Sequence, residues 1–63
     1  MGIGEKLKAW RLERYLSQEE AAREIGISHA TISLLEGGSR SPQYKTWRKL
    51  AAAMGVTVAE LQA

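Results

Sequence analysis

The chain has 63 residues, which places it near the size at which a single hydrophobic core can just fold unaided, and we expect one domain over residues 1–63. It contains one histidine, no cysteine and no aspartate, so disulfides, metal clusters and carboxylate dyads are not expected, and neither is a cofactor. No apolar run approaches the roughly 20 residues of a membrane span, and the N-terminus lacks the apolar segment of a signal peptide. These features favour a cytoplasmic protein without a membrane partner.

Charge is distributed unevenly along the chain, although the net charge is only +2. Residues 1–16 carry a net charge of +2, residues 17–37 a net charge of −3, and residues 38–63 a net charge of +3. Basic segments therefore flank an acidic central unit. This balance permits an anionic partner, but many solvated helix faces have a similar composition.

Apolar residues at helical spacing predict a first helix from Gly4 to about Arg14. The candidates for its inner face are Ile3, Leu7, Trp10 and Leu12. We interpret Trp10 as a core residue. Stacking of its ring on unpaired bases is the alternative.

A capping box predicts that a second helix begins at Gln18. Ser17 and Glu20 have the S-x-x-E spacing in which each side chain accepts a hydrogen bond from the backbone of the other residue. Gly26 follows at the place where a helix C-terminus favours a left-handed residue, a conformation that glycine adopts without steric cost.

A third helix is predicted from Ser28, a good N-cap, to Gly37. Either Gly37 or Gly38 can supply the left-handed residue that closes it. Ile32 and Leu35 form its inner side. Only a short turn separates it from the second helix.

Pro42 suits a first helical position and predicts a fourth helix from Pro42 to Met54. Its inner face is expected to contain Tyr44, Trp47, Leu50, Ala51 and Met54. Gly55 ends this helix, and Thr57 with Glu60 forms a second capping box that starts a final short helix. The sequence therefore predicts an all-α fold of five helices without a strand.

The second and third helices have the spacing of a helix-turn-helix unit, in which the second helix of the pair enters the major groove of DNA. Counting Gln18 as the first position, the small residue Ala22 is fifth and Gly26 is ninth, in the turn. Ile32 and Leu35 are fifteenth and eighteenth, where core contacts are needed.

The chain resembles the phage repressor family of helix-turn-helix domains, the Cro-like or Xre-like group, over nearly its whole length. The segments that carry the resemblance, in the family's order, are SQEEAA, ISHATISLLEGG, the Pro42 loop, WRKLAAAMGV and TVAEL. The resemblance implies a compact five-helix domain that binds double-stranded operator DNA, commonly as a homodimer on a palindromic site, and represses or regulates transcription. No enzyme and no small-molecule ligand are expected, because Ser, His and Glu form no recognisable catalytic constellation.

Two further features come from the resemblance. In relatives, an arginine and a glutamate at the positions of Arg11 and Glu36 pair across the first and third helices and hold the recognition helix at its docking angle; two independent surface charges are the alternative. Tyr15 occupies a position usually held by glycine, where φ is often positive. Either the turn differs here or the backbone is strained.

The outer face of the third helix is expected to contact bases. Placing Ile32 and Leu35 inward points Ala30 and Leu34 outward. The residues expected at base edges are His29, Ala30, Thr31, Ser33 and Leu34. Apolar side chains can contact thymine methyl groups, and the polar ones can hydrogen-bond to base edges or phosphates, so we expect a preference for sites that contain thymine. His29 is interpreted as a hydrogen-bonding surface residue, not a metal ligand or a catalytic base.

Phosphate contacts are expected from helix N-termini, where free N–H groups and the helix dipole favour anions, and from the loop before the fourth helix. The candidates are Ser17, Gln18, Ser39, Arg40, Ser41, Gln43, Tyr44 and Lys45. The other cations are expected on solvated faces, namely Lys6, Lys8, Arg48 and Lys49.

Two alternatives to a transcription regulator remain open. An exposed face containing Ala30 and Leu34 could pack on another protein, as in an antitoxin whose DNA binding is secondary. An engineered DNA binder on the same scaffold would also have strong helix caps and no cysteine.

Overall fold

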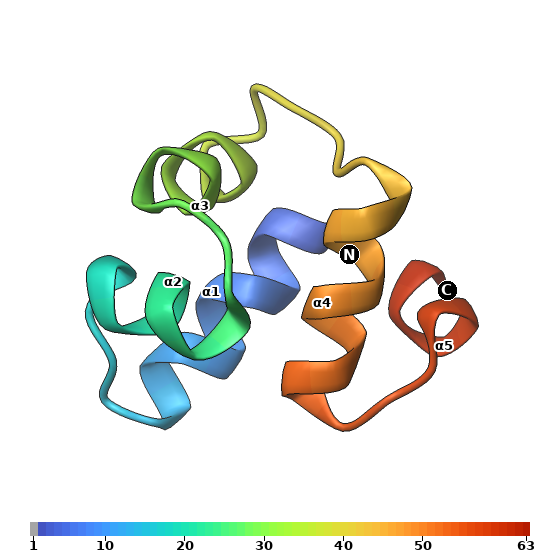
Figure 1. Cartoon of the computed structure of the whole chain (residues 1–63), viewed down its shortest axis with the longest axis horizontal. Helices are drawn as coiled ribbons and strands as arrows, with labels where there is room; N and C mark the ends of the chain where they lie inside the picture. Colours follow the sequence, from blue (N-terminus) through green and yellow to red (C-terminus); the bar gives the residue numbers. More distant parts are fainter. Residues whose placement is uncertain (1) are drawn as a thin grey trace.

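The computed structural model describes residues 2–63, which form five helices and no strand (Figure 1). The helices are α1 (Ile3–Glu13), α2 (Gln18–Ile25), α3 (His29–Glu36), α4 (Tyr44–Met54) and α5 (Val58–Gln62). The predicted all-α architecture of five helices is confirmed. No helix in this described part has the length and apolar character needed to span a membrane.

The start of α2 has the predicted capping box. Ser17 Oγ accepts a hydrogen bond from the Glu20 N–H at 3.0 Å, and the Glu20 carboxylate accepts one from the Ser17 N–H at 2.8 Å. The bond from the Ser17 backbone is the main reason that the pKa of Glu20 lies below its ordinary value. At the other end of α2, Gly26 has φ 87°, in the left-handed region, as predicted.

A short turn leads from Gly26 to the N-cap of α3. Ser28 Oγ accepts a hydrogen bond from the Thr31 N–H at 3.1 Å, which confirms the predicted cap. Of the two glycines that could close α3, Gly37 keeps a right-handed conformation with φ −77°. Gly38 has φ 75° and is the left-handed residue.

The predicted start of α4 at Pro42 is wrong. Gln43 is extended, with φ −75° and ψ 164°, and the first helical bond runs from the Trp47 N–H to the Gln43 carbonyl at 2.9 Å. Helix α4 therefore begins at Tyr44. The fixed φ of proline suits an extended backbone as well as a helix start, and here the extended stretch forms the long connection between α3 and α4 in Figure 1.

The core is formed by the inner faces of all five helices. Its buried residues are Leu7, Ala21, Ala22, Ile25, Ile32, Leu35, Leu50, Ala51 and Leu61. Trp10 and Trp47 are partly buried and pack against this cluster, so Trp10 is a core residue as interpreted.

Two of the expected inner residues are exposed. Leu12 is 53% exposed, because at 100° per residue it lies roughly 140° around α1 from the buried Leu7. Tyr44 is 69% exposed, because it stands at the first position of α4, where its ring lies beneath Arg48 rather than against the core.

The N-terminal turn of α1 packs closely against the C-terminal end of α3. A Cβ atom added at Gly4 would overlap the backbone carbonyl of Leu35. Glycine at this position thus allows the two backbones to approach each other, and it fixes the end of α3 against α1.

The turn between α1 and α2 contains a strained residue. Tyr15 has φ 56° and its side chain is 94% exposed. The Leu16 N–H donates to the Arg11 carbonyl at 3.0 Å, the hydrogen-bond pattern that closes a helix around a left-handed residue. Of the two alternatives drawn from the sequence, backbone strain is therefore the one observed.

Candidate nucleic-acid interface

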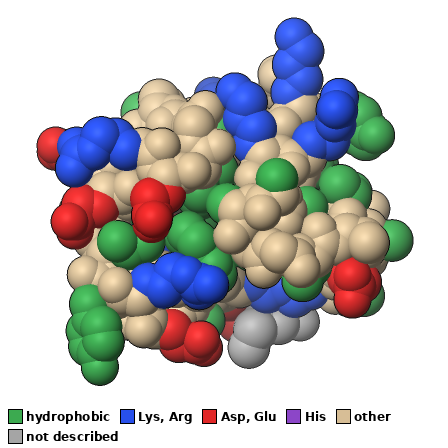
Figure 2. Space-filling view, turned by 60° about the horizontal axis from the view of Figure 1, so that its bottom comes forward, with side chains coloured by type: hydrophobic (Ala, Val, Ile, Leu, Met, Phe, Trp, Pro, Cys, Tyr) green, Lys and Arg blue, Asp and Glu red, His purple; other side chains and the backbone are tan. Residues whose placement is uncertain are grey.

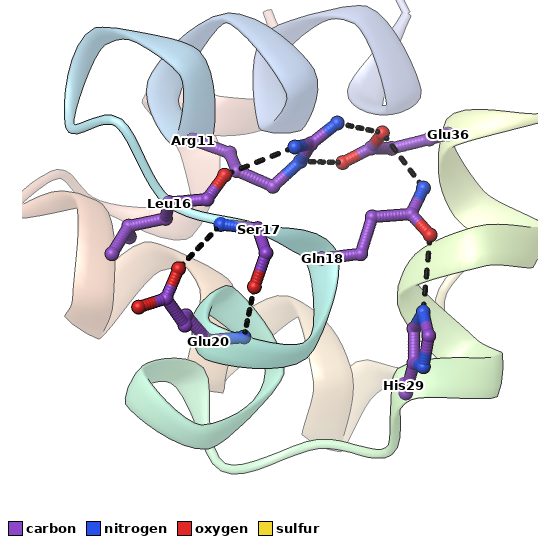
Figure 3. Close-up of polar contacts among 7 residues, drawn as sticks. All are labelled: Arg11, Leu16, Ser17, Gln18, Glu20, His29 and Glu36. Atoms are coloured by element: carbon purple, nitrogen blue, oxygen red, sulfur yellow. Dashed lines mark hydrogen bonds and ion pairs between the residues drawn. The ribbon is translucent and has the colours of Figure 1, made fainter.

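A bidentate ion pair joins α1 to the end of α3. Arg11 Nε donates to Glu36 Oε2 at 2.8 Å, and Arg11 Nη2 donates to Glu36 Oε1 at 2.8 Å (Figure 3). The two side chains are only 12% and 6% exposed. Arg11 Nη1 also donates to the Leu16 carbonyl at 3.0 Å, so one guanidinium holds both α3 and the turn that precedes α2.

The environment of this pair favours its charged form. Its hydrogen bond to Glu36 raises the pKa of Arg11 above the ordinary value. Burial alone would raise the pKa of Glu36, but hydrogen bonds from Arg11 and Gln18, together with the positive charges of Arg11 and Lys8, more than offset it and leave the pKa lowered. Both groups are therefore ionised at neutral pH.

Gln18 extends the network from the ion pair to the start of α3. Its Nε2 donates to Glu36 Oε1 at 3.2 Å, and its Oε1 lies 3.1 Å from Nε2 of His29 (Figure 3). The side chain of Gln18, a residue expected to contact phosphate, is thus hydrogen-bonded to two residues of α3. The Gln18 backbone N–H still stands at the N-terminus of α2, where helical N–H groups have no partner within the helix.

The outward side of α3 consists of Ala30, Ser33 and Leu34, and we call this set the reading face. All three are exposed, Leu34 to 36%. Thr31 differs from them, because it is half-buried and its Oγ1 lies 2.8 Å from Ser28 Oγ. The five residues expected at base edges are therefore of two kinds, three on the reading face and two, His29 and Thr31, with side chains already hydrogen-bonded.

The residues expected to contact phosphate lie at the start of α2 and along the connection between α3 and α4. Six of them are exposed residues of that connection or of the first turn of α4, namely Ser39, Arg40, Ser41, Gln43, Tyr44 and Lys45. In Figure 1 the connection runs from the end of α3 to the top of α4. The Ser17 N–H and hydroxyl are both used in the capping box, and the Ser39 N–H donates to the Leu34 carbonyl at 3.0 Å.

One structural contact could not be seen in the sequence. Lys49, expected on a solvated face, donates from Nζ to the Gly26 carbonyl at 3.0 Å and so ties α4 to the turn of the helix-turn-helix unit. With Lys45 and Arg48 it lines a shallow groove of about 420 Å³. In Figure 2 several Lys and Arg side chains gather at the upper right, whereas elsewhere on that face basic and acidic side chains lie beside one another.

A family model described as helix-turn-helix matches residues 7–61. The chain belongs to the helix-turn-helix family. Within the helix-turn-helix motif, α2 is the first helix and α3 is the second, which is the recognition helix. The family is one of DNA-binding regulators, so this chain is a DNA-binding domain of the kind that transcription regulators carry.

Several curated proteins are similar to this chain. The cryptic phage CTXphi transcriptional repressor RstR of Vibrio cholerae is 45% identical over 56 residues, which cover 89% of this chain and 50% of the repressor. The control protein C.MunI of a Mycoplasma species is 37% identical over 60 residues, covering 94% of this chain and 81% of that protein. The immunity repressor protein of Bacillus phage phi105 is 30% identical over 61 residues, covering 97% of this chain and 42% of the repressor.

These relatives confirm the resemblance to phage repressors. The chain spans 50% of the Vibrio repressor and 42% of the Bacillus phage repressor, so it corresponds to about half or less of each. No solved structure gives a significant match.

Proposed function

We propose that this helix-turn-helix domain binds specific sequences of double-stranded DNA with α3 in the major groove and thereby represses or regulates transcription. The observation that carries the proposal is the asymmetry of α3. Ile32 and Leu35 are buried and Glu36 is fixed by Arg11, whereas the reading face is open to solvent. A helix braced on one side and exposed on the other is suited to enter the groove.

Base recognition is assigned in this proposal to the reading face and its neighbours. Ala30 and Leu34 offer methyl groups to thymine, and Ser33 offers a hydroxyl that can donate or accept. Thr31 contributes less directly, because its hydroxyl lies beside that of Ser28. His29, the first residue of α3, is the remaining candidate for a base contact.

Phosphate recognition is assigned to the N-terminus of α2 and to the connection between α3 and α4. Arg40 and Lys45 supply the positive charge, and the Gln18 backbone supplies an N–H group. Polar groups of Ser17, Ser39, Ser41, Gln43 and Tyr44 are further candidates. Contacts of this kind set the register of the protein on DNA and most of its salt dependence.

The proposal includes binding as a homodimer to a palindromic site, as the resemblance to phage repressors implies. Selection from randomised duplex DNA tests both parts of it. A palindromic consensus whose half-sites lie one helical turn apart supports a dimer. A single short half-site contradicts the dimer, and failure to enrich any sequence contradicts specific recognition.

Two substitutions separate base contacts from phosphate contacts on the selected site. Leu34→Ala should change which sequence is preferred. Arg40→Ala should weaken binding to all sequences alike and reduce the slope of log affinity against log salt by about one. Arg23→Ala is the matched control, because Arg23 is exposed on α2 and lies 3.8 Å from Glu19. The proposal would be refuted if Leu34→Ala weakened binding to all sequences alike and Arg40→Ala changed the preferred sequence.

A further inference from the structure

The hydrogen bonds between Arg11 and His29 have a fixed direction, which is set by the Glu36 carboxylate. An ionised carboxylate can only accept, and Glu36 receives bonds from Arg11 at 2.8 Å and from Gln18 at 3.2 Å. Gln18 must therefore turn its NH₂ group toward Glu36. Its carbonyl oxygen then faces His29, as Figure 3 shows.

The orientation of Gln18 determines where His29 carries its proton. Gln18 Oε1 is an acceptor only, and it lies 3.1 Å from Nε2 of His29, so Nε2 must be the donor of this bond. A neutral imidazole that has its proton on Nε2 has a lone pair on Nδ1. The buried ion pair thus selects one tautomer of a residue on the DNA side of the motif.

The second ring nitrogen of His29 is available to a ligand. Within residues 2–63, Nδ1 makes no hydrogen bond, and the side chain is exposed. His29 is the first residue of α3, and residues at the N-terminal end of a recognition helix contact base edges.

Resting on the proposed docking of α3 in the major groove, we infer that His29 is a specificity-determining residue that accepts a hydrogen bond at Nδ1 from a base. In the major groove only adenine N6 and cytosine N4 are donors, whereas guanine and thymine present acceptors. His29 therefore selects adenine or cytosine at one position of the site, next to the thymine contacts of the reading face.

The position read by His29 is found by repeating the duplex selection with His29→Ala and comparing its consensus with that of the wild type. The position at which the variant loses the preference of the wild type is the contacted one. Because every base pair contains either adenine or cytosine, this selection identifies the contacted pair, and the strand is identified by the base modification described next. An unchanged consensus overturns the inference.

Removal of the exocyclic amino group tests the hydrogen bond itself. Purine in place of adenine, or pyrimidinone in place of cytosine, should weaken wild-type binding by about three- to tenfold, the range of one hydrogen bond. The same duplex should bind His29→Ala as tightly as the unmodified one. An equal loss in both proteins overturns the inference.

The positioning role of Gln18 has its own test. Gln18→Ala frees the imidazole to place its proton on Nδ1, so guanine or thymine at the contacted position should gain at least about threefold in relative affinity, again the scale of one hydrogen bond. A uniform loss of affinity for all four bases would indicate a merely structural role and would contradict the inference.

Nitrogen NMR of the free protein gives a readout that does not depend on DNA binding. The wild type should show the proton on Nε2 of His29, and Gln18→Ala should show a mixture of tautomers. A proton on Nδ1 in the wild type overturns the inference even where the domain binds DNA. Absence of any specific duplex binding, by contrast, is a failure of the proposed function.

Discussion

The two sides of α3 are built differently. On the inward side, Ile32 and Leu35 are 0% and 1% exposed and Glu36 is held by two hydrogen bonds from Arg11. On the outward side, Leu34 is 36% exposed and belongs neither to the buried core cluster nor to the hydrophobic residues packed against it. Stabilising contacts are thus concentrated on the inward side, and we propose that sequence recognition belongs to the outward side. Substitutions on the two sides should therefore have separable effects.

The largest expected difference is between two neighbouring leucines. Leu35→Ala removes a fully buried side chain from the core and should cost about 2–5 kcal/mol in the free energy of unfolding. Leu34→Ala, the same change one residue earlier, should cost less than about 1 kcal/mol. Urea unfolding followed by circular dichroism measures both.

A loss this large can unfold a domain of 63 residues altogether. Leu35→Val, a smaller reduction in volume, then keeps the comparison measurable, with an expected loss of about 1 kcal/mol. Equal losses at residues 34 and 35 would show that Leu34 belongs to the core.

Removal of Glu36 should affect both sides of α3. Glu36→Ala leaves the buried guanidinium of Arg11 unpaired, and we expect a loss of about 3 kcal/mol in stability. DNA affinity should also fall, since we propose that the pair holds α3 at its docking angle. Glu24→Ala, on the exposed side of α2, is the control. If Glu36→Ala had the same melting temperature as the wild type, the ion pair could not have the stabilising role expected of it.

Low pH should selectively weaken the contacts that Glu36 makes on the inward side of α3. The pKa of Glu36 is held below its ordinary value of 4.5, so its ionised form stabilises the fold above about that pH. This contribution is lost as the pH falls through the lowered pKa. The pKa values of Glu20 and Glu60 are lowered as well, so wild type must be compared with Glu36→Gln.

At neutral pH the wild type should be more stable than Glu36→Gln by about 1.5–3 kcal/mol, the range for hydrogen bonds to a charged group. Between about pH 5 and pH 3 the difference should shrink, because only the wild type carries the titrating carboxyl group. Chemical unfolding at a series of pH values measures it. A difference that stays constant over this range would assign the stabilisation to shape and packing instead of charge.

Local features of this fold could be predicted from the sequence. The capping box at Ser17 and Glu20 and the left-handed Gly26 involve residues close together in the chain, and all were predicted. The buried face of α3 followed from the helical period. The start of α4 was predicted wrongly, because Pro42 is compatible with both a helix start and an extended connection.

The site depends on contacts that sequence spacing does not contain. Lys49 reaches Gly26 across 23 positions, and Gln18 reaches Glu36 across 18, distances at which chain separation gives no guide to proximity. The pairing of Glu36 with Arg11 was expected only through the family resemblance. Tertiary packing decides which of several exposed polar residues meet. This is why the sequence alone could not show that Nε2 of His29 donates a hydrogen bond to Gln18.

The smallest expected effect lies in the turn that supports the inward side. Tyr15, at φ 56°, pays a steric cost that glycine avoids, so Tyr15→Gly should stabilise the domain by about 1 kcal/mol after allowing for the greater entropy of the unfolded chain. Tyr44→Gly, at the first position of α4, should be destabilising instead, because no left-handed strain is relieved there. Thermal unfolding of the two variants gives the comparison.

Tyr15→Gly also tests whether the two sides of α3 are independent. Its turn presents the Leu16 carbonyl to Arg11, which in turn holds Glu36. Relief of the strain should leave this geometry intact, so stability should rise while the base preference measured by duplex selection stays the same. A change in preference would mean that strain in the turn is transmitted through Arg11 to the reading face, and that the two sides of α3 are coupled.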